Sequence, residues 1–256
     1  MVITGGSSGI GKATAELFAS NGYRVYELSR HGNDADRIKH IDCDVTQPED
    51  CRNAISHIIE ECGTVDVLIS NAGMGISGAV EFTELSEAKR QFEVNFFGAL
   101  NITQAVLPYM RERRSGRIIF VSSMMAAFSL PFQAFYGATK SAVNSLALSL
   151  RNEVAPFGIE ICSLMPGDVK TGFTASRSKS LAGSDIYTNM DHAVSTMEYD
   201  EQHGITPERM ARKLLSLAKT KHPEAVSTVG LKYKAFMLLG KLCPTTLAYR
   251  IIGKMY

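Results

Sequence analysis

Short apolar runs alternate with longer amphipathic stretches along most of the chain. In those longer stretches, apolar residues recur at three- and four-residue steps, which is typical of a helix that lies against a sheet. Strands that alternate with helices in this way form a parallel sheet covered by helices on both faces. The pattern therefore predicts an α/β fold with a doubly wound parallel sheet. The predicted strands are residues 1–3, 23–28, 38–42, 65–69, 118–121, 159–164 and 225–227.

Helices are predicted where an apolar stripe is bounded by residues that start or stop a helix. Pro48 opens one helix and Gly63 closes it, while Thr206-Pro207 opens another. The predicted helices are a first one that ends at Asn21-Gly22, a long and mostly helical segment at 86–113, and residues 49–62, 136–154 and 206–220.

The first predicted strand leads directly into a glycine-rich turn, Thr4-Gly5-Gly6-Ser7-Ser8-Gly9-Ile10-Gly11, which opens the first helix. Gly5 permits a tight turn, Gly9 lets a pyrophosphate approach the backbone, and Gly11 lets the helix pack closely on the strand. The helix N-terminus then offers N–H groups and a partial positive charge to phosphates. This context predicts a dinucleotide site, and a glycine-rich turn without a ligand is the alternative.

The second predicted strand ends at Ser29-Arg30, and these residues bear on the choice of cofactor. A dinucleotide fold that prefers NAD places an acid here for the ribose hydroxyls, whereas an arginine accommodates the 2′-phosphate of NADP. The acid is missing and Arg30 is present, so we predict that NADP(H) is favoured over NAD(H). The alternative is that Arg30 is a solvated surface charge. After the third strand, Asp44 is predicted either to meet the adenine or to cap a turn.

Three side chains suited to carbonyl chemistry lie further along the chain. Ser123 follows the strand predicted at 118–121, and Tyr136 and Lys140 are four residues apart on one helix face. Because a nearby cation favours the phenolate, we expect Lys140 to lower the pKa of Tyr136 from its usual value near ~10 towards that of a general acid and base. Ser123 would donate a hydrogen bond to a carbonyl oxygen while Tyr136 gives that oxygen a proton. The alternative is an ordinary exposed tyrosine beside a solvated lysine.

Such a site contains no source of hydride, so the chemistry requires a cofactor. Asn95, in a largely apolar part of the segment at 86–113, is a further candidate. A buried amide that finds no partner costs about 1 kcal/mol or more. We expect Asn95 either to brace the helix or to hold a water beside Lys140.

Composition narrows the class of protein. At 256 residues the chain fits one large domain, and 27 basic residues against 26 acidic residues favour a small neutral partner over nucleic acid. Five cysteines without a Cys-x-x-Cys pair argue against a disulfide framework or a metal site and indicate a reducing cytoplasm. We also expect no signal peptide, and no run approaches the ~20 apolar residues of a spanning helix.

Two segments are expected to serve the substrate. Residues 168–205 are polar and weakly periodic, and we interpret them as a variable substrate lid. Residues 232–256 are apolar with interspersed cations, and Pro244 divides them into two short amphipathic helices. This tail is expected to pack on the body, on a second subunit or on a membrane surface. The apolar residues between Ser123 and Tyr136 predict a pocket wall, with buried core or a subunit interface as alternatives; they are Met124, Met125, Ala126, Ala127, Phe128, Leu130 and Phe132.

Taken together, these motifs resemble the short-chain dehydrogenase/reductase family over residues 1–171. The resemblance rests on Thr4-Gly5-x-x-x-Gly9-x-Gly11, Asp44, Asn71-Ala72-Gly73, Asn95, Ser123, Tyr136-x-x-x-Lys140 and Pro166-Gly167-x-x-x-Thr171. It implies a Rossmann-like sheet of about seven strands in the order 3-2-1-4-5-6-7, in a single domain of residues 1–256.

The resemblance also assigns roles to individual residues. Tyr136 would be the proton donor in reduction and the base in oxidation, and Lys140 would lower its pKa and bind the nicotinamide ribose. Ser123 would orient the substrate carbonyl, and Asn95 would hold a water in a proton relay. The residues implied to bind the cofactor are Gly5, Ser7, Ser8, Gly9, Ile10, Gly11, Arg30, Asp44, Val45, Asn71, Ala72, Gly73, Tyr136, Lys140, Pro166, Gly167, Val169 and Thr171.

The implied activity is an NADP(H)-dependent interconversion of a ketone or aldehyde and its alcohol, on a hydrophobic lipid, steroid or acyl-like substrate. Many relatives that use NADP have a basic residue where this chain has Ser8, so the NADP(H) prediction rests on Arg30. The resemblance further implies a cytoplasmic homodimer or homotetramer, with membrane-surface contact through the tail as an option. A catalytically silent dinucleotide-binding regulator or scaffold is the alternative, and the set Asn95, Ser123, Tyr136 and Lys140 argues against it.

Overall fold

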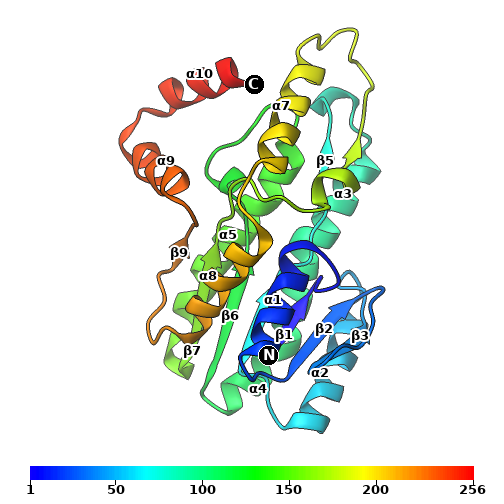
Figure 1. Cartoon of the computed structure of the whole chain (residues 1–256), viewed down its shortest axis with the longest axis vertical. Coiled ribbons are helices and arrows are strands. Elements are labelled where there is room, and N and C mark those ends of the chain that lie inside the picture. Colours follow the sequence, from blue (N-terminus) through cyan, green and yellow to red (C-terminus); the bar gives the residue numbers. More distant parts are fainter.

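Seven parallel strands form the central sheet of the protein, whose structure is a computed structural model (Figure 1). The structure describes residues 1–256, apart from the side chain of Lys241. In sheet order the strands are β3 (Ile38–Asp42), β2 (Val25–Ser29), β1 (Val2–Thr4), β4 (Val67–Ser70), β6 (Gly116–Val121), β7 (Ile159–Leu164) and β9 (Val226–Ser227). Counted along the chain, this is the predicted order 3-2-1-4-5-6-7, so the doubly wound α/β fold is confirmed. Two further short strands, β5 (Ile76–Ser77) and β8 (Ser178–Lys179), pair with each other beside the cavity described below.

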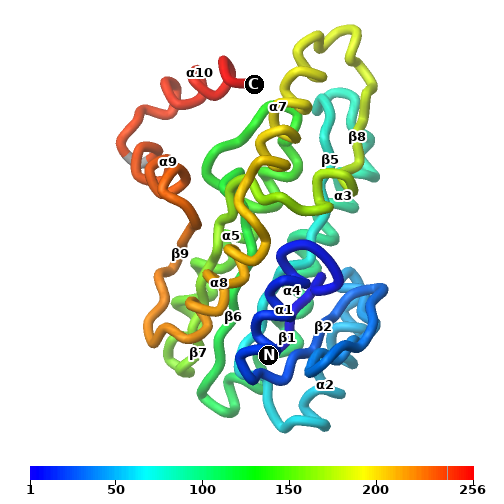
Figure 2. The backbone as a smooth tube through the Cα atoms, in the orientation of Figure 1, coloured from blue at the N-terminus to red at the C-terminus, as the bar shows by residue number. Residues whose placement is uncertain are grey.

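Helices cover both faces of this sheet, as the smooth backbone tube also shows (Figure 2). The α-helices are α1 (Gly9–Ser20), α2 (Pro48–Cys62), α3 (Leu85–Phe92), α4 (Gly98–Glu112), α5 (Ala134–Val154), α6 (Phe173–Ser176), α7 (Met190–Gln202), α8 (Pro207–Lys219), α9 (Leu231–Leu242) and α10 (Thr245–Met255). A π-helical turn, Glu93–Phe97, joins α3 to α4, and single 3₁₀ turns occupy Val80–Phe82, Met124–Ala126 and Ala155–Phe157.

The central strands are apolar on both faces because each face is covered. Neighbouring residues of a strand point to opposite faces, and Ile118 and Ile119 of β6 are both fully buried. Ile118 packs in one core with side chains of α2, α4 and α5, whereas Ile119 packs in a second core with side chains of α1 and α8. This explains why the strands occur in the sequence as continuous apolar runs rather than as an alternating pattern.

The sheet places the functional residues at one edge. From β1 the chain runs outward through β2 and β3, and it then returns to place β4 on the other side of β1. The carboxyl ends of β1 and β4 therefore flank the point at which the strand order reverses, where open α/β sheets bind their ligands. The glycine turn after Thr4 and the segment that starts at Asn71 both begin at this point.

Two predicted segments have more structure than their sequences indicate. The helix predicted at 86–113 is divided by the π turn, which is one residue wider than an α turn. The polar stretch at 168–205 contains α6, β8 and the 13-residue α7. A stripe of Met190, Ala193 and Met197 buries one face of α7, but the polar residues between them weaken the periodic signal.

The C-terminal segment forms α9 and α10, which are separated at Cys243 and Pro244. Both helices lie beyond the carboxyl ends of the strands, on the side of β9, and the C-terminus lies near α7 (Figures 1 and 2), where Tyr256 donates to Asp200 at 3.3 Å. Across the described chain, no helix combines the length and the apolar character needed to cross a membrane.

A buried acid and a histidine pair across the outer strands of the sheet. Glu27 of β2 and His40 of β3 are register partners, and Glu27 is 3% exposed. His40 Nδ1 lies 2.5 Å from Glu27 Oε2, and His40 Nε2 lies 3.0 Å from Asp42 Oδ1. Burial by itself lowers the pKa of His40, but its hydrogen bonds with Glu27 and Asp42 outweigh that effect and raise it. The charged imidazole therefore stabilises the fold.

We predict that His40→Gln makes stability less dependent on pH. A folded-state pKa above the unfolded value near ~6.5 means that the stabilisation is complete in mild acid and is lost as pH rises through the folded value. At pH ~5.5 the variant should lose about 1–3 kcal/mol of unfolding free energy in urea titrations. The difference from the wild type should shrink towards pH ~9, and a difference independent of pH would contradict the assignment.

Candidate active site

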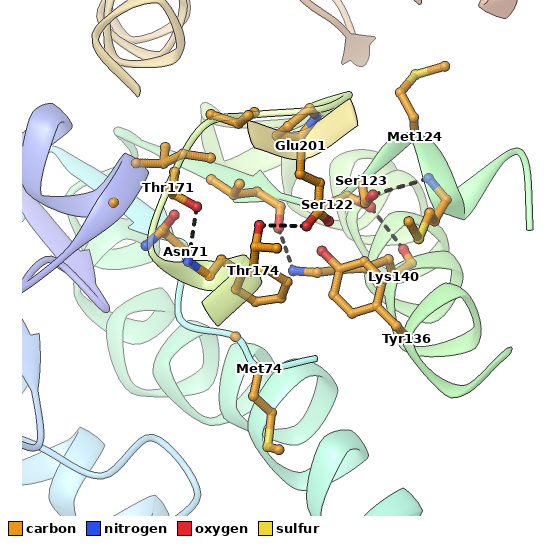
Figure 3. A pocket seen from close by; sticks show the side chains of 18 of the residues that line it. Asn71, Met74, Ser122, Ser123, Met124, Tyr136, Lys140, Thr171, Thr174 and Glu201 are labelled. Carbon is orange, nitrogen blue, oxygen red and sulfur yellow. Dashed lines mark hydrogen bonds between the residues drawn. The ribbon is translucent and has the colours of Figure 1, made fainter. Parts of the chain in front are cut away.

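A cavity of about 1620 Å³ opens along the carboxyl edge of the sheet. The glycine turn, the end of β6, the start of α5 and both C-terminal helices contribute to its lining, and Figure 3 shows part of that lining from close by. Typical ligand pockets measure about 300–1,000 Å³. The cavity is therefore large enough for a dinucleotide together with a substrate.

Hydrogen bonds join the glycine turn to the end of β4. The hydroxyl oxygen of Thr4 accepts the backbone N–H groups of Asn71 at 3.0 Å and Ala72 at 3.1 Å. The side-chain amide of Asn71 donates in turn to the carbonyls of Thr4 and Gly5, at 3.0 and 3.1 Å. The first two turns at the cavity edge are thus held as one unit.

The glycines of the first turn keep its backbone bare. Gly5 and Gly9 have φ of +64° and +51°, which side chains rarely adopt. A Cβ at Gly5 would lie 2.9 Å from the Cα of Ala72, and a Cβ at Gly9 would lie 3.4 Å from Thr171. Backbone N–H groups at the start of α1 therefore face the cavity with little covering, which fits a pyrophosphate.

The end of β6 and the start of α5 bring the predicted reactive groups together. The ammonium of Lys140 donates to the carbonyl of Val121 at 2.9 Å and lies 5.8 Å from the centre of the Tyr136 ring. The hydroxyl of Ser122 donates to the carbonyl of Lys140 at 2.9 Å, which binds the helix to the strand. Ser123 accepts the N–H of Met125 at 3.1 Å, and this leaves its hydroxyl proton for a ligand. Figure 3 shows Ser123, Tyr136 and Lys140 around one part of the cavity.

The expectation that Lys140 lowers the pKa of Tyr136 is wrong in this structure. Burial raises the pKa of Tyr136 to about 12, an effect that Glu201 increases and that Arg177 and Ser123 oppose. Burial also lowers the pKa of Lys140 to about 8. Removal from water disfavours the charged form of both groups, and it is the largest cause of each shift. The phenol is therefore held in its protonated form at neutral pH.

Sequence analysis did not identify Arg177, which is the cation that acts on Tyr136. Its side chain is 1% exposed, and its guanidinium lies 2.5 Å from Glu201 and 5.4 Å from the Phe173 ring. The Phe173 ring lies 5.7 Å from the ring of Tyr136, and Glu201 also accepts the hydroxyl of Thr174 at 2.6 Å. These residues belong to the weakly periodic stretch at 168–205, where no motif marks them.

Asn95 lies in the π turn and is 1% exposed. Its amide nitrogen donates to the carbonyl of Met74 at 2.9 Å and to Thr139 at 3.0 Å, and its amide oxygen accepts the N–H of Met74 at 2.8 Å. Both N–H bonds of the side chain are thus used within the protein, so the side chain braces α5 against the segment after β4. Its assignment to a water relay stays a prediction.

Most of the residues predicted to bind the cofactor line the cavity. Two residues of the predicted site, Gly11 and Asn95, do not line the cavity. A Cβ at Gly11 would collide with the carbonyl oxygen of Gly5 and lie 2.7 Å from the Asn71 amide nitrogen. The predicted residues on the lining are Gly5, Ser7, Ser8, Gly9, Ile10, Arg30, Asp44, Val45, Asn71, Ala72, Gly73, Ser123, Tyr136, Lys140, Pro166, Gly167, Val169 and Thr171.

Arg30 and Asp44 lie at the same end of the cavity. Arg30 is exposed at the rim, just after β2. Asp44 caps a turn, because its carboxylate accepts the N–H and the hydroxyl of Thr46 at 2.9 and 2.8 Å. The capping alternative therefore holds for Asp44, while the residue also faces the cavity.

The opposite end of the cavity is mainly apolar. Of the apolar residues predicted as a wall, Met124, Met125, Phe128 and Leu130 line it. Phe132 instead packs against Tyr187, with ring centres 6.1 Å apart. The C-terminal helices supply the facing side, with Phe236, Leu239, Ala248, Ile251, Ile252 and Met255.

Comparison with known proteins identifies the family. The family model described as short chain dehydrogenase matches residues 1–182. The chain belongs to the short-chain dehydrogenase family. Members are oxidoreductases that act on CH–OH and C=O groups with a nicotinamide dinucleotide, and this chain is an enzyme of that class.

Three proteins illustrate the similarity of this short-chain dehydrogenase to others. The 3-ketodihydrosphingosine reductase of Bacteroides thetaiotaomicron is 39% identical over 234 residues, which cover 90% of this chain and 87% of that protein. A short-chain dehydrogenase from Streptomyces avermitilis has a crystal structure that matches with a TM-score of 0.86 at 30% identity, covering 94% of this chain and 90% of that one. The structure of ElxO with NADP bound matches with a TM-score of 0.76 at 27% identity, covering 91% and 98%.

We predict that Gly11→Ala weakens dinucleotide binding by about tenfold or more, because the added methyl group displaces Gly5 and Asn71 from the turn. Fluorescence titration with NADPH measures the affinity. Gly253→Ala is the matched control, since neither Gly11 nor Gly253 has a positive φ and a Cβ at Gly253 would have open space around it. Equal affinities of the two variants would contradict this account of the turn.

Proposed function

We propose that this enzyme is an NADP(H)-dependent reductase of a ketone or aldehyde carried by a hydrophobic, lipid-like substrate. The observation that carries the proposal is the cavity itself, which has Ser123, Tyr136 and Lys140 on one part of its lining and apolar side chains beyond them. The relative named 3-ketodihydrosphingosine reductase supports the choice of substrate class. A carbonyl on a long hydrocarbon chain fits both the polar and the apolar part of the cavity.

The residues of the site divide the work of reduction. Tyr136, whose pKa is about 12, keeps its proton at neutral pH and donates it to the carbonyl oxygen as the alcohol forms. Ser123 donates a hydrogen bond to the same oxygen and holds it in place. Lys140 donates one N–H to the carbonyl of Val121 and has two more N–H groups for the hydroxyls of the nicotinamide ribose. The bound dinucleotide supplies the hydride.

The end of β2 supports the preference for NADP(H). No acid directly follows β2, where Ser29 is succeeded by the exposed Arg30. The acid within β2, Glu27, is buried and paired with His40, so it does not reach a ribose at the rim. The presence of Arg30 on the cavity lining supports pairing with a 2′-phosphate, and NADP is the cofactor bound in the ElxO structure.

We propose further that the enzyme is a homodimer or homotetramer that works in the cytoplasm at a membrane surface. Leu148 of α5 and Phe97, just before α4, remain exposed, which suits an interface built on these helices. A lipid-like substrate resides in membranes, and the apolar, cationic C-terminal segment suits contact with one.

Tyr136→Phe should lower kcat for NADPH-dependent ketone reduction by roughly 10²–10⁴-fold, because the variant has no proton to donate. The dissociation constant for NADPH should change by less than about twofold, since the ring and Lys140 remain. Tyr199→Phe, at an exposed tyrosine, is the control and should keep full activity. Full activity in the Tyr136 variant would refute the assignment. A wild-type protein that binds NADPH but reduces no hydrophobic ketone or aldehyde would favour the silent scaffold.

Arg30→Ala should raise KM for NADPH by about tenfold or more and leave KM for NADH nearly unchanged, because only NADPH carries the 2′-phosphate. Arg52→Ala, at an exposed arginine outside the cavity lining, should change neither constant. Both cofactors are compared on one ketone by absorbance at fixed pH. A parallel loss with NADH, or a wild-type preference for NADH, would remove the basis for NADP(H).

A further inference from the structure

Positive charge is concentrated in the last 26 residues of the chain. Residues 231–256 contain five of the 27 basic residues and none of the 26 acidic residues. The first 230 residues therefore contain 22 basic and 26 acidic residues and are net negative. This asymmetry indicates that α9 and α10 face a negatively charged partner that the rest of the surface does not attract.

The same helices expose large apolar side chains away from the cavity. Leu238 and Leu242, one turn apart on α9, are 61% and 75% exposed, and neither lines the cavity. Leu231 and Leu247 are likewise exposed and outside the lining. Lysine and arginine residues are interspersed among them, and Lys234, Arg250 and Lys254 are exposed and outside the lining. A helix pair with leucines and cations but no acids on its outer side has the character of an interfacial membrane segment.

The other side of the pair forms a wall of the cavity. Ala248, Ile252 and Met255 of α10 lie on the lining, as does Phe128. Each of the two helices therefore contacts the cavity and also presents at least one exposed leucine outside it, Leu247 in the case of α10.

The attachment of α10 to the body is slight. None of its residues, all of which the structure describes, is buried. Its side chains make two hydrogen bonds to the body: Tyr249 accepts the N–H of Ser129 at 3.2 Å, and Tyr256, just after the helix, donates to Asp200 at 3.3 Å. Extended backbone at Cys243 and Pro244 separates α10 from α9, and Tyr233 at the base of α9 is well buried. The pair is thus held firmly at its base and weakly at its end.

We propose that α9 and α10 form a membrane-docking lid, whose leucines insert into an anionic bilayer and whose α10 moves from the cavity so that a lipid substrate enters from the bilayer. This inference rests on the proposed function for its substrate, and it adds the partner surface and the route of entry. A second copy of the chain is a less suitable occupant, because two such segments would bring ten cations together without an acid among them.

Vesicle flotation tests the docking step. The full chain should float with vesicles of phosphatidylcholine containing ~30% phosphatidylglycerol, and at least about tenfold less with pure phosphatidylcholine. Leu238→Ser combined with Leu242→Ser should reduce binding about tenfold. Leu85→Ser combined with Leu181→Ser removes two equally exposed leucines elsewhere and should bind like the wild type. Wild-type protein that stays unbound, or a Leu238/Leu242 variant whose only change is dissociation of a dimer in ultracentrifugation, overturns the proposal.

Activity measurements separate this inference from the proposed function. A short, water-soluble ketone should be reduced equally by the wild type and the Leu238/Leu242 variant, with or without vesicles. A long-chain ketone embedded in anionic vesicles should be reduced about tenfold faster by the wild type than by the variant. If the wild type floats but reduces neither ketone, the proposed function fails while docking stands. If both proteins reduce the embedded ketone equally, the entry route is wrong and the reductase assignment stands.

Discussion

The hydrogen bonds between Thr4 and Asn71 hold the two halves of the site together, since they join the strands between which the sheet changes direction. Two residues beyond Asn71, a Cβ at Gly73 would lie 3.3 Å from Asn95 and 3.4 Å from the ammonium of Lys140. A short stretch of backbone, which ends at Gly73, therefore connects the glycine turn to Asn95 and Lys140. A shift of either β1 or β4 would therefore displace residues at both ends of the cofactor site.

The sequence predicts those parts of the protein that depend on neighbouring residues. The glycine turn, the apolar strands and the four-residue spacing of Tyr136 and Lys140 are local patterns, and the structure places each where its pattern indicates. A continuous apolar strand also implies cover on both faces, which fixes the layer architecture. The order of the strands, by contrast, came from resemblance to a family.

The properties that depend on distant residues could not be predicted in this way. The pKa of Tyr136 is set mainly by burial, which the spacing to Lys140 does not reveal. Arg177 acts on the phenol from a segment whose only strong feature, the buried stripe of α7, is hidden among polar residues. Asn95 could be recognised as a buried amide, but its partners Met74 and Thr139 emerge only from the packing of α5.

The cavity joins a rigid region to a yielding one. The polar groups lie on strand ends and on the N-terminal turns of long helices. The two hydrophobic cores hold these elements rigidly, so the distances between the polar groups vary little. The apolar end is walled by helices with few buried residues, where varied chains can be accommodated. The parts of the fold that select the carbonyl group are thus different from the parts that accept the remainder of the substrate.

The π turn between α3 and α4 sets the rotation of one helix relative to the other about their common direction. The extra residue in this turn rotates the apolar face of α3 relative to that of α4. The two helices therefore pack against different neighbours, while the backbone continues without a loop. A chain one residue shorter here could remain helical throughout, yet α3 would be rotated by about 100° relative to α4. The amide of Asn95 would then lose its hydrogen bonds to Met74 and Thr139. A single deletion in the π turn would therefore be enough to displace α5, the helix that carries Tyr136.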